Sequence, residues 1–348
     1  MTARRDGLAK TGRERVTIFV PTYNRAQWLA NAIESALGQT YEDFVLIVSD
    51  NCSTDRTREV VETFDDPRLV YLQQPEHLEL NEHFNLCYGL ARTDYMFLIP
   101  DDDVMAPDAL EQMIPVLDAY PRVGLVHGCA RLVDETGATI EPAHHMTQLE
   151  GDEVESGGAF IRRAVDQGYR VHASTALIRT ASLADVRLRD DEFPVTDVGL
   201  WFRLALSWDL AFLHRPLAVV RVHSGSYTAD GRGVTQGGYV QQTNVIEKLL
   251  EVKLGFVDEF EGRLSDADEL REIARRARRR DLLDLAGHMT IPERRVVDTV
   301  RTLGELGRLD PGIFVERRTW RLLGASVLGR RAVERLKRRG ESGERLAA

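Results

Sequence analysis

The sequence contains few cysteines and no long apolar segment. Its three cysteines, Cys52, Cys87 and Cys129, are widely spaced and odd in number, which excludes a disulfide framework and a zinc site of paired cysteines. This cysteine usage favours a reducing compartment. No stretch reaches the roughly 18 apolar residues that span a bilayer. Residues 1–15 are polar and charged, which predicts a disordered lead-in and not a secretory signal. We therefore expect a cytoplasmic protein, and attachment to the inner face of the membrane stays an alternative.

Common nucleotide-binding and nucleophile motifs are also absent. The sequence has no GxGxxG motif and no GxxxxGKS or GxxxxGKT motif, which excludes a dinucleotide site and a Walker-type phosphate loop. No serine or cysteine lies in a nucleophile elbow. The formal net charge of -10 argues against nonspecific binding to nucleic acid. With 348 residues, 43% of them hydrophobic, the chain is long enough for a large domain and an appendage.

Short apolar runs alternate with helical patterns from Val16 onward. Strands are predicted at residues 16–20, 44–48, 69–72 and 95–99, and helices at residues 27–37, 54–64, 81–90 and 108–120. Ser53 or Thr54 is the expected N-cap of the second of these helices. Strands that alternate with helices of this length are typical of an α/β fold, in which helices cover a mainly parallel sheet.

The second half of the chain has a more irregular pattern. It predicts a strand at 123–133, a polar surface loop at 141–158, strands at 174–179, 210–213 and 218–223, and a helix at 198–207. After a linker or mobile loop at 225–238, helices are predicted at 244–260, 266–285, 292–306 and 316–338. We therefore divide the chain into the lead-in 1–15, an α/β domain at 16–235 and a helical C-terminal region at 236–348.

The acidic triplet Asp101, Asp102 and Asp103 directly follows the apolar run 95–100. Adjacent carboxylates disfavour each other's ionisation unless a cation offsets their charge. Mg²⁺ and Mn²⁺ prefer oxygen ligands and often share them with substrate phosphates. In open α/β sheets, ligands bind outside the carboxyl ends of the strands. The triplet therefore predicts a metal–diphosphate site. The alternative is a solvated turn that caps the helix starting near Pro107.

Five segments, taken in order along the chain, resemble the motifs of family 2 glycosyltransferases, which have the GT-A fold. The segments are residues 16–25 (VTIFVPTYNR), 47–55 (IVSDNCSTD), 101–103 (DDD), 193–203 (FPVTD followed by LWFR) and 221–223 (RVH). The resemblance implies a Rossmann-like mixed sheet, with residues 16–235 as the catalytic domain. It also implies a metal-dependent, inverting transfer of a sugar from a nucleotide-diphosphate sugar to an acceptor hydroxyl. The synthesis of cell-envelope polysaccharide or another glycoconjugate is the corresponding role.

The resemblance places a set of residues around the nucleotide sugar: Pro21, Thr22, Tyr23, Arg25, Asp50, Asn85 and Asp101. Asp50 would accept a hydrogen bond from the base, and Arg25 would meet a phosphate as a charge-assisted donor. Asp101 would serve the ribose or a bound water. Three alternatives stay open: Asp50 as an N-cap or turn residue, Tyr23 as core filling, and Asn85 as a helix-surface residue.

The resemblance also assigns the metal ligands and the general base. Pro100 stands where the family usually has its first acid, so Asp102 is the expected direct ligand, and Asp103 is a further ligand or an orienting group. His223 is the expected secondary ligand of a Mn²⁺ or Mg²⁺ ion, and its alternative is a structural role. Asp197 is the expected general base that takes the proton of the acceptor hydroxyl. Its alternative is a helix N-cap.

The C-terminal region carries arginine clusters at 275–280 and 335–339. A basic amphipathic helix can bind an anionic membrane, and the alternative is a helix packed on the catalytic domain with a solvated basic face. The expected partners are a nucleotide-diphosphate sugar and a carbohydrate, lipid-linked or small-molecule acceptor, without nucleic acid. A homodimer is left open. Two other functions also stay open: a sugar nucleotidyltransferase, and a noncatalytic nucleotide-binding or scaffold protein.

Overall fold

The computed structural model describes residues 14–144, 149–167, 171–223 and 239–290, and also residues 300, 303–304, 307–308, 311–315 and 319–320. The strands are β1 (Val16–Thr22), β2 (Phe44–Asp50), β3 (Leu69–Gln73), β4 (Tyr95–Leu98), β5 (Val104–Met105), β6 (Val123–Val133), β7 (Thr139–His144), β8 (Glu153–Glu155), β9 (Leu177–Arg179) and β10 (Asp209–Arg221). The α-helices are α1 (Ala26–Leu37), α2 (Thr57–Glu62), α3 (Leu80–Leu90), α4 (Ala109–Ala119), α5 (Gly157–Gln167), α6 (Thr196–Ala205), α8 (Tyr239–Glu259) and α9 (Ala267–Thr290).

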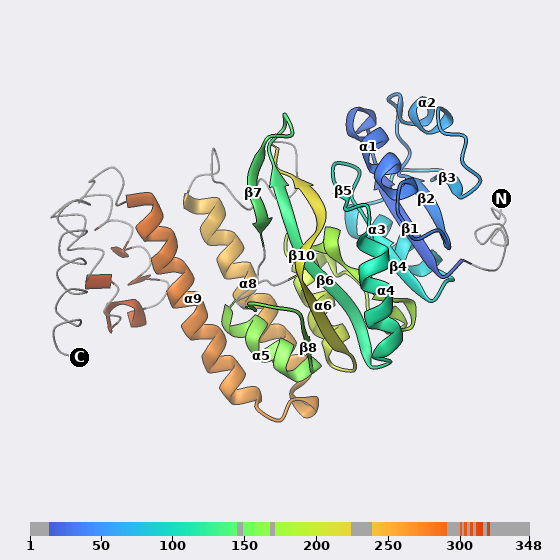
Figure 1. The fold of residues 1–348 in the computed structure, drawn as a ribbon. Helices are drawn as coiled ribbons and strands as arrows, with labels where there is room; N and C mark the ends of the chain where they lie inside the picture. Colours follow the sequence, from blue (N-terminus) through green and yellow to red (C-terminus); the bar gives the residue numbers. More distant parts are fainter. Residues whose placement is uncertain are drawn as a thin grey trace, which may run out of the picture.

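In these residues, the strands form one mixed sheet with the order β3-β2-β1-β4-β9-β6-β10-β5 (Figure 1). β7 pairs with β6, and β8 pairs with β10. The first half of the sheet is parallel, because β1 pairs in parallel with both β2 and β4. β9 then pairs antiparallel with β4 and β6. The predicted α/β class, with helices that flank a mixed sheet, is therefore confirmed. The sheet was predicted to be mainly parallel, and the described strand pairs are parallel from β3 to β4 and mostly antiparallel beyond β4.

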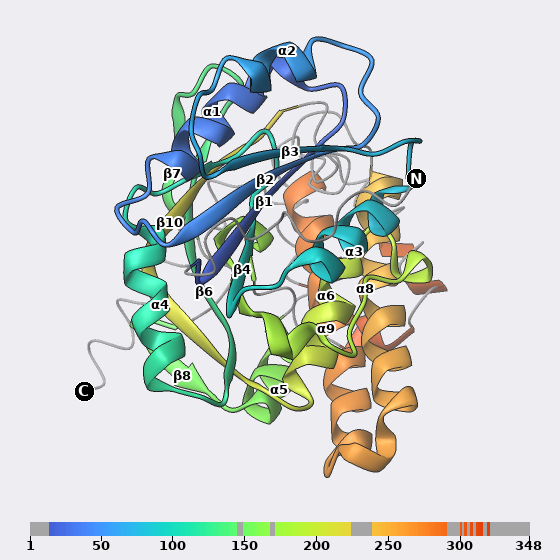
Figure 2. The ribbon, with the colours of Figure 1, turned by 90° about the vertical axis from the view of Figure 1, so that its right-hand side faces the viewer.

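Helices cover both faces of the sheet (Figure 2). On one face, α1 and α4 share a buried cluster with the sheet that includes Leu29 and Met113. On the other face, a second cluster joins α3, α5 and α6 to α8 and α9 and includes Trp201 and Phe256. Every residue of β1, β2 and β4 is buried. Strands buried on both faces form continuous apolar runs, which is why these three were recognisable in the sequence.

The helix that follows β2 is shorter than the predicted helix at 54–64, and its predicted N-cap is wrong. α2 begins at Thr57, and neither Ser53 nor Thr54 caps it. The Asp55 side chain instead accepts hydrogen bonds from the amide and the hydroxyl of Thr57, at 3.0 and 2.6 Å. A short acidic side chain that bonds the backbone two residues onward forms a turn, and this turn delays the start of the helix.

The segment 141–158, which we predicted to be a loop, contains the end of β7, the strand β8 and the start of α5. Ile140 in β7 and Val154 in β8 are 57% and 42% exposed. β7 pairs with β6 and β8 pairs with β10 at the margins of the sheet. Such uncovered strands need few apolar residues, so their sequence does not differ from that of a loop.

The strands predicted at 210–213 and 218–223 are parts of one strand, β10, which is irregular at Pro216. Proline lacks the amide that a sheet requires, and in strands it occurs at edges and bulges. The irregular part of β10 lies very close to β6. A Cβ atom on Gly128 would lie 2.6 Å from Leu217 Cδ1 and 2.8 Å from the Leu213 carbonyl oxygen. Glycine at 128 therefore permits the close approach of the two strands.

Residues 1–13 of the predicted lead-in lie outside the described residues, and Arg15, which was predicted to belong to it, is bonded to the sheet domain. The backbone of Arg15 bonds Asp43 and Tyr95, and its guanidinium lies 2.7 Å from an Asp118 oxygen. The hydrogen bond from Arg15 lowers the pKa of the Asp118 carboxyl to about 2. The predicted loop at 225–238 lies outside the described residues, as does most of the helices predicted at 292–306 and 316–338. No described helix combines the length and the apolar character needed to cross a bilayer.

Gly128→Ala should lower the free energy of unfolding by about 1–3 kcal/mol, because the added methyl group overlaps backbone that cannot move freely. Gly89→Ala is the matched control, because a Cβ atom at Gly89 in α3 meets no atom within 4 Å. We expect it to be neutral or to stabilise the protein by up to about 1 kcal/mol. Urea unfolding of both variants measures the difference. Equal effects would contradict the close contact at Gly128.

Candidate active site

The residues of the predicted site follow three strands that end at the same edge of the sheet. β1 ends at Thr22 and β2 ends at Asp50, and these two residues are paired in the register of the strands. β4 is continued by Ile99, whose amide bonds the Phe19 carbonyl in β1 at 2.9 Å. The acidic triplet therefore begins beside the end of β1. This is the edge at which ligands bind in open α/β sheets.

Asn24 locks the loop after β1 to the loop after β2. It adopts a left-handed conformation, with φ of 53°, which asparagine tolerates better than most residues. Its side-chain oxygen accepts the Thr54 amide at 2.8 Å, and its own amide donates to the Ser53 hydroxyl at 2.9 Å. The Asp55 side chain also joins the two loops, because it accepts a hydrogen bond from the Ala26 amide at the start of α1. Asn24 was not among the predicted site residues, although an asparagine in a loop after a strand is a signal for a left-handed turn residue.

Asp50 is fully buried, and both of its oxygens accept hydrogen bonds. The Ser53 amide lies 2.9 Å from Oδ1, and the Tyr71 hydroxyl lies 2.5 Å from Oδ2. Burial and the bond to Asp50 raise the pKa of Tyr71, so the phenol stays protonated and remains a donor. These contacts agree with a role of Asp50 as a turn residue, which was the alternative to its predicted contact with the base. Its contact with a base stays a prediction.

Tyr23 lies at the surface and not in the core, so its predicted alternative as core filling is wrong. Its side chain is 42% exposed, and its ring lies against the ring of His77 with centroids 4.2 Å apart. Tyr23 follows β1 and His77 follows β3, so this aromatic pair provides flat surfaces for a planar ligand beyond the carboxyl ends of these strands. His77 was not among the residues that the sequence indicated.

All three acidic residues of the triplet are buried. Burial, and then the charge of Asp102, raise the pKa of Asp101 to about 7. The same two causes raise the pKa of Asp103. The Ser174 hydroxyl and the Arg221 amide donate to the two oxygens of Asp103, at 2.5 and 2.9 Å. This arrangement favours the orienting role over the ligand role for Asp103.

Asp102 and His223 come together although 121 positions separate them in the sequence. His223 Nε2 lies 2.9 Å from Asp102 Oδ2, and the imidazole ring packs on Trp28 with centroids 4.2 Å apart. The Arg25 guanidinium lies 2.5 Å from the same Asp102 oxygen. Arg25, which we expected at a phosphate, is thus paired with the acidic triplet. Within the described residues, no three acidic, histidine or cysteine side chains converge as a metal site.

Helix α3 connects the nucleotide side of the site to the segment before α6. The Asn85 amide group both donates to the Leu188 carbonyl and accepts the Leu188 amide, at 3.0 and 2.9 Å. Asn85 is therefore not a free helix-surface residue but a clamp on the backbone. On the same helix, His83 Nε2 lies 2.9 Å from the Ser49 hydroxyl of β2. Burial lowers the pKa of His83 to about 4, so this residue is neutral at pH 7.

Asp197, the predicted general base, lies in the first turn of α6. One of its oxygens accepts the Val198 amide at 3.0 Å. Its charge contributes to the raised pKa of the buried Tyr88 in α3, which places Asp197 near that helix. The structure does not place Asp197 at the N-cap position, which Val195 occupies.

A buried ion pair fixes the turn that leads into α6, and the sequence search did not identify it as such. The Glu192 side chain is 11% exposed and the Arg203 side chain is 6% exposed. Two guanidinium nitrogens of Arg203 donate to the two carboxylate oxygens of Glu192. Arg203 also donates to the Arg187 carbonyl at 2.8 Å. Gly199 makes room for the pair, because a Cβ atom there would overlap the Glu192 carboxylate. Both Glu192 carboxylate oxygens are therefore bound by Arg203.

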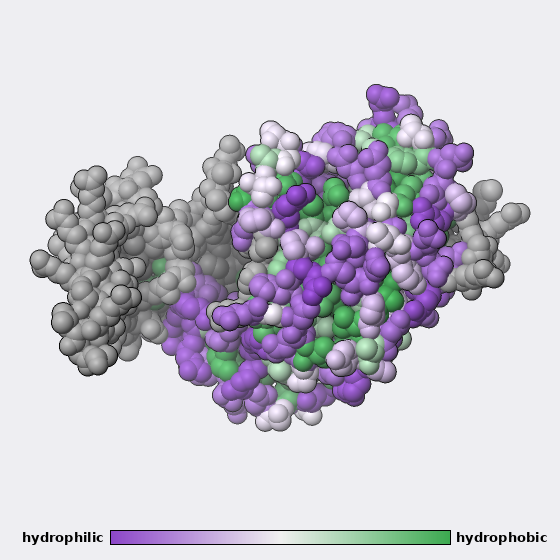
Figure 3. Space-filling view, viewed as in Figure 1, coloured by the Kyte–Doolittle hydropathy of each residue, from purple (hydrophilic) through white to green (hydrophobic). Residues whose placement is uncertain are grey.

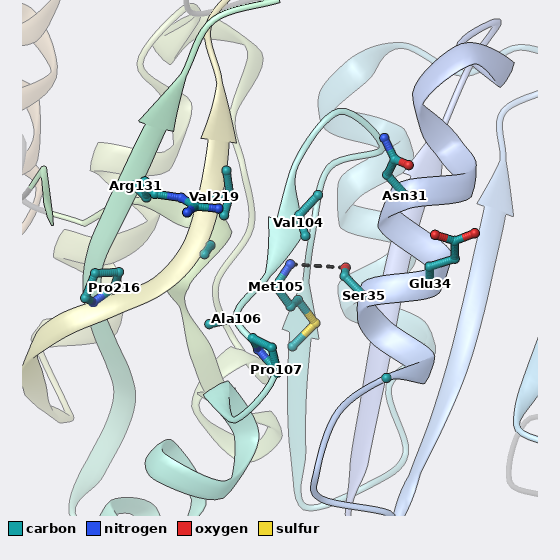
Figure 4. Close-up of a pocket in the computed structure, with 12 residues that line it drawn as sticks. Asn31, Glu34, Ser35, Val104, Met105, Ala106, Pro107, Arg131, Pro216 and Val219 are labelled. Atoms are coloured by element: carbon teal, nitrogen blue, oxygen red, sulfur yellow. Dashed lines mark hydrogen bonds between the residues drawn. The ribbon is translucent and has the colours of Figure 1, made fainter. Parts of the chain in front are cut away.

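A groove of about 720 Å³ lies between α1, β5 and β10 (Figure 4). Asn31 and Ser35 line it from α1, and Val104 and Val219 line it from the strands. Figure 4 also shows the Met105 amide donating to the Ser35 hydroxyl across the groove, at 3.1 Å. The lining contains none of the predicted site residues, so this groove is distinct from the predicted nucleotide pocket.

The arginine cluster at 275–280 lies on α9, where hydrophilic side chains cover much of the surface of α5 and α9 (Figure 3). Several of its members are paired with acids: Arg275 with Glu272 at 3.9 Å, Arg278 with Glu247 at 2.7 Å, and Arg280 with Asp166 at 3.5 Å. These pairs agree with the alternative of a helix packed on the catalytic domain. The second cluster, at 335–339, lies outside the described residues, and membrane contact stays a prediction.

Comparison with known proteins finds similarity to glycosyltransferases. The sequence model of Glycosyl transferase family 2 matches residues 17–177. An uncharacterized glycosyltransferase of Rickettsia prowazekii is 24% identical over 215 residues, which are 61% of this chain and 65% of that protein. WcaA of Escherichia coli, named for colanic acid biosynthesis, is 33% identical over 97 residues, which are 27% of this chain and 35% of that protein. The matches thus span less than two thirds of these relatives' own length.

Among solved structures, residues 1–349 of S. aureus TarS in complex with UDP-GlcNAc have a similar fold. The TM-score is 0.58 at 16% sequence identity, and the match covers 94% of this chain and 92% of that chain. The full TarS structure matches with a TM-score of 0.55 over 90% of this chain and 52% of that chain. These likenesses establish the GT-A fold that the sequence predicted.

Glu192→Gln should lower the free energy of unfolding by about 3–5 kcal/mol, because it leaves the Arg203 charge buried without its partner. Glu59→Gln is the matched control, because Glu59 pairs with Arg56 on the surface of α2 with side chains 66% and 82% exposed. Such an exposed pair contributes at most about 1 kcal/mol. Urea unfolding at one pH compares the two variants. A loss at Glu192 no larger than that at Glu59 would mean that the buried pair is unimportant.

Proposed function

We propose that the protein, whose residues 17–177 match the sequence model of Glycosyl transferase family 2, transfers a sugar from a nucleotide-diphosphate sugar to an acceptor hydroxyl. The transfer inverts the anomeric carbon and depends on a divalent metal ion. The binding of UDP-GlcNAc by S. aureus TarS, which has a similar fold, supports a nucleotide-sugar donor. The likeness to WcaA supports a role in polysaccharide or glycoconjugate synthesis. A cytoplasmic location, in reach of both donor and acceptor, completes the proposal.

One observation carries this proposal: separate elements bring donor-binding and charge-bearing groups to one edge of the sheet. Tyr23 follows β1, Asp50 ends β2, Asp102 follows β4, and His223 follows β10. The pairing of Asp102 with His223 at 2.9 Å joins the ends of β4 and β10 across 121 positions of the chain. A solvated turn, which was the alternative for the acidic triplet, would leave its carboxylates exposed, whereas these are buried.

The residues present fit a Mn²⁺ or Mg²⁺ ion. Asp102 supplies a carboxylate and His223 an imidazole nitrogen, and a buried carboxylate whose pKa is raised, such as that of Asp101, gains from a nearby cation. Such ions are usually held by one or two carboxylates together with substrate phosphates. The ion would neutralise the charge that develops on the departing diphosphate. Asp103 would orient the triplet through its bonds to Ser174 and Arg221.

The residues of the chain supply binding and proton transfer. The ring of Tyr23, backed by His77, would stack on the base, and Asp101 would bind the ribose. Asp197 would accept the proton of the acceptor hydroxyl while this hydroxyl attacks the anomeric carbon on the face opposite the diphosphate. The base is then on the opposite side of the sugar from the leaving group, which gives inversion in one step.

Calorimetric titration of UDP, GDP, TDP, CDP and ADP, each with and without Mn²⁺, tests the proposal. We expect one diphosphate to bind tightly in a Mn²⁺-dependent manner and Asp102→Asn to abolish the dependence. A nucleotidyltransferase would instead bind the nucleoside triphosphate and release pyrophosphate. If no nucleotide binds under any metal condition, the chain is a scaffold on this fold and not a transferase.

Asp197→Asn should keep donor binding and lower the rate of transfer by about 10²- to 10⁴-fold, because amide cannot accept the proton. Asp191→Asn is the control, because Asp191 is an exposed acid in the turn at 190–192, which precedes α6. Single-turnover transfer from a radiolabelled nucleotide sugar to acceptor or to water gives the rate. If Asp191→Asn is the slower variant, the base is misassigned.

Tyr23→Ala should weaken the binding of the preferred nucleotide by about 1–3 kcal/mol, which is the usual contribution of an aromatic ring stacked on a base. Tyr120→Ala removes an equally exposed tyrosine at the end of α4 and should have no effect. Titration of both variants with the same nucleotide provides the comparison. An unchanged affinity in Tyr23→Ala would remove this residue from the pocket.

A further inference from the structure

The Arg25 guanidinium lies directly on the acidic triplet. Its Nη1 atom is 2.5 Å from Asp102 Oδ2 and 3.6 Å from Asp101 Oδ1. The Arg25 side chain is 20% exposed, and the two carboxylates are 10% and 6% exposed, so water screens these charges only partly. Arg25 therefore supplies the positive charge that two buried carboxylates need in this state of the protein.

The oxygen that Arg25 contacts is the same one that faces His223. Asp102 Oδ2 lies between Arg25 Nη1 at 2.5 Å and His223 Nε2 at 2.9 Å. A divalent ion bound by this oxygen and this nitrogen would lie about 2 Å from the carboxylate. The guanidinium would then be a like charge at almost the same position. The ion and Arg25 cannot both hold Asp102 Oδ2 in the present geometry.

Two other groups could bind the Arg25 guanidinium after it leaves Asp102: the Trp28 ring and a phosphate. It lies in the short link between β1 and α1, and its guanidinium carbon is 5.8 Å from the centre of the Trp28 ring. An aromatic face can carry a guanidinium that has left a carboxylate. The planar fork of arginine also matches two oxygens of a phosphate group. A diphosphate bound beside Asp102 would present such oxygens.

We propose that Arg25 is an exchangeable counter-cation that holds Asp102 in the absence of a divalent ion and moves to the donor diphosphate when the ion binds. This inference rests on the proposed function, because it assumes a diphosphate and an ion at this edge of the sheet. The exchange makes ion and nucleotide bind cooperatively. The ion must displace Arg25 when it binds alone, whereas the diphosphate compensates this loss when both bind. By linkage, each ligand raises the affinity for the other by the same factor.

Titration of the full chain with Mn²⁺ alone tests the exchange. Arg25→Gln removes the competing charge, so we expect it to bind Mn²⁺ about tenfold more tightly than the wild type. Arg56→Gln removes an arginine that is 82% exposed and paired with Glu59, and it should bind Mn²⁺ as the wild type does. Electron paramagnetic resonance of free Mn²⁺ measures these affinities without any activity assay.

Titration with UDP in the presence of Mn²⁺ gives the second measurement. In Arg25→Gln, UDP should bind more weakly, and the factor by which UDP raises the Mn²⁺ affinity should shrink relative to the wild type. Arg25→Lys keeps the charge but loses the planar fork. We expect its Mn²⁺ affinity to lie between those of the wild type and Arg25→Gln, which keeps the test valid if Arg25→Gln does not fold.

Mn²⁺ binding that is no tighter in Arg25→Gln and Arg25→Lys than in the wild type would overturn the exchange. If the variants also lose UDP binding, Arg25 is a fixed phosphate ligand, and the proposed transferase stands without the exchange. If the wild type binds no nucleotide in the panel described above, the proposed function itself fails. The Mn²⁺ titration and the nucleotide panel therefore separate the two failures.

Discussion

Negative charge held in a buried position is the constraint on which the rest of this structure depends. The acidic triplet at 101–103 is less than one tenth exposed, and burial together with mutual repulsion raises the pKa of two of its members. Each carboxylate is therefore matched by groups from distant parts of the chain. Arg25 comes from the loop after β1, Ser174 from the turn before β9, and Arg221 and His223 from the end of β10. These partners fix where the loops around the site must run.

The proposed mechanism also requires that the predicted donor side and the predicted proton-accepting side of the site keep a constant relation. Helix α3 meets this requirement, because its residues hold both. His83 bonds Ser49 at the end of β2, and Asn85 holds Leu188 in the segment that leads to α6. The neutral state of His83 is part of this function, since a buried imidazolium would need a counter-charge that the contact with a hydroxyl does not supply. The helix thus acts as a spacer between two parts of one site.

The sequence indicated the elements that are buried on both faces and the residues that carry charge, because both leave a strong local pattern. It did not indicate β7 and β8, whose exposed positions resemble a loop. It also did not indicate which polar residues support the others. Asn24 forms hydrogen bonds with residues that are 29 to 31 positions away in the sequence. Glu192 pairs with Arg203 across a turn, and no periodic pattern in the sequence indicates this pair. Such pairs depend on the completed fold, so a single sequence gives the ligands of a site more readily than the residues that position them.

The helices after residue 238 also belong to this positioning. We predicted a boundary at 236, yet the hydrophobic cluster under α6 continues without a break into α8 and α9. Phe202 in α6 lies against Phe256 in α8 with ring centroids 5.0 Å apart. Arg189, in the segment before α6, pairs with Glu259 at the end of α8 at 2.6 Å. Asp197 lies between these two contacts in the chain. The segment that bears the proposed base is thus held by α3 on one side and by α8 on the other, so the C-terminal helices are part of the structure that sets its geometry and not an independent appendage.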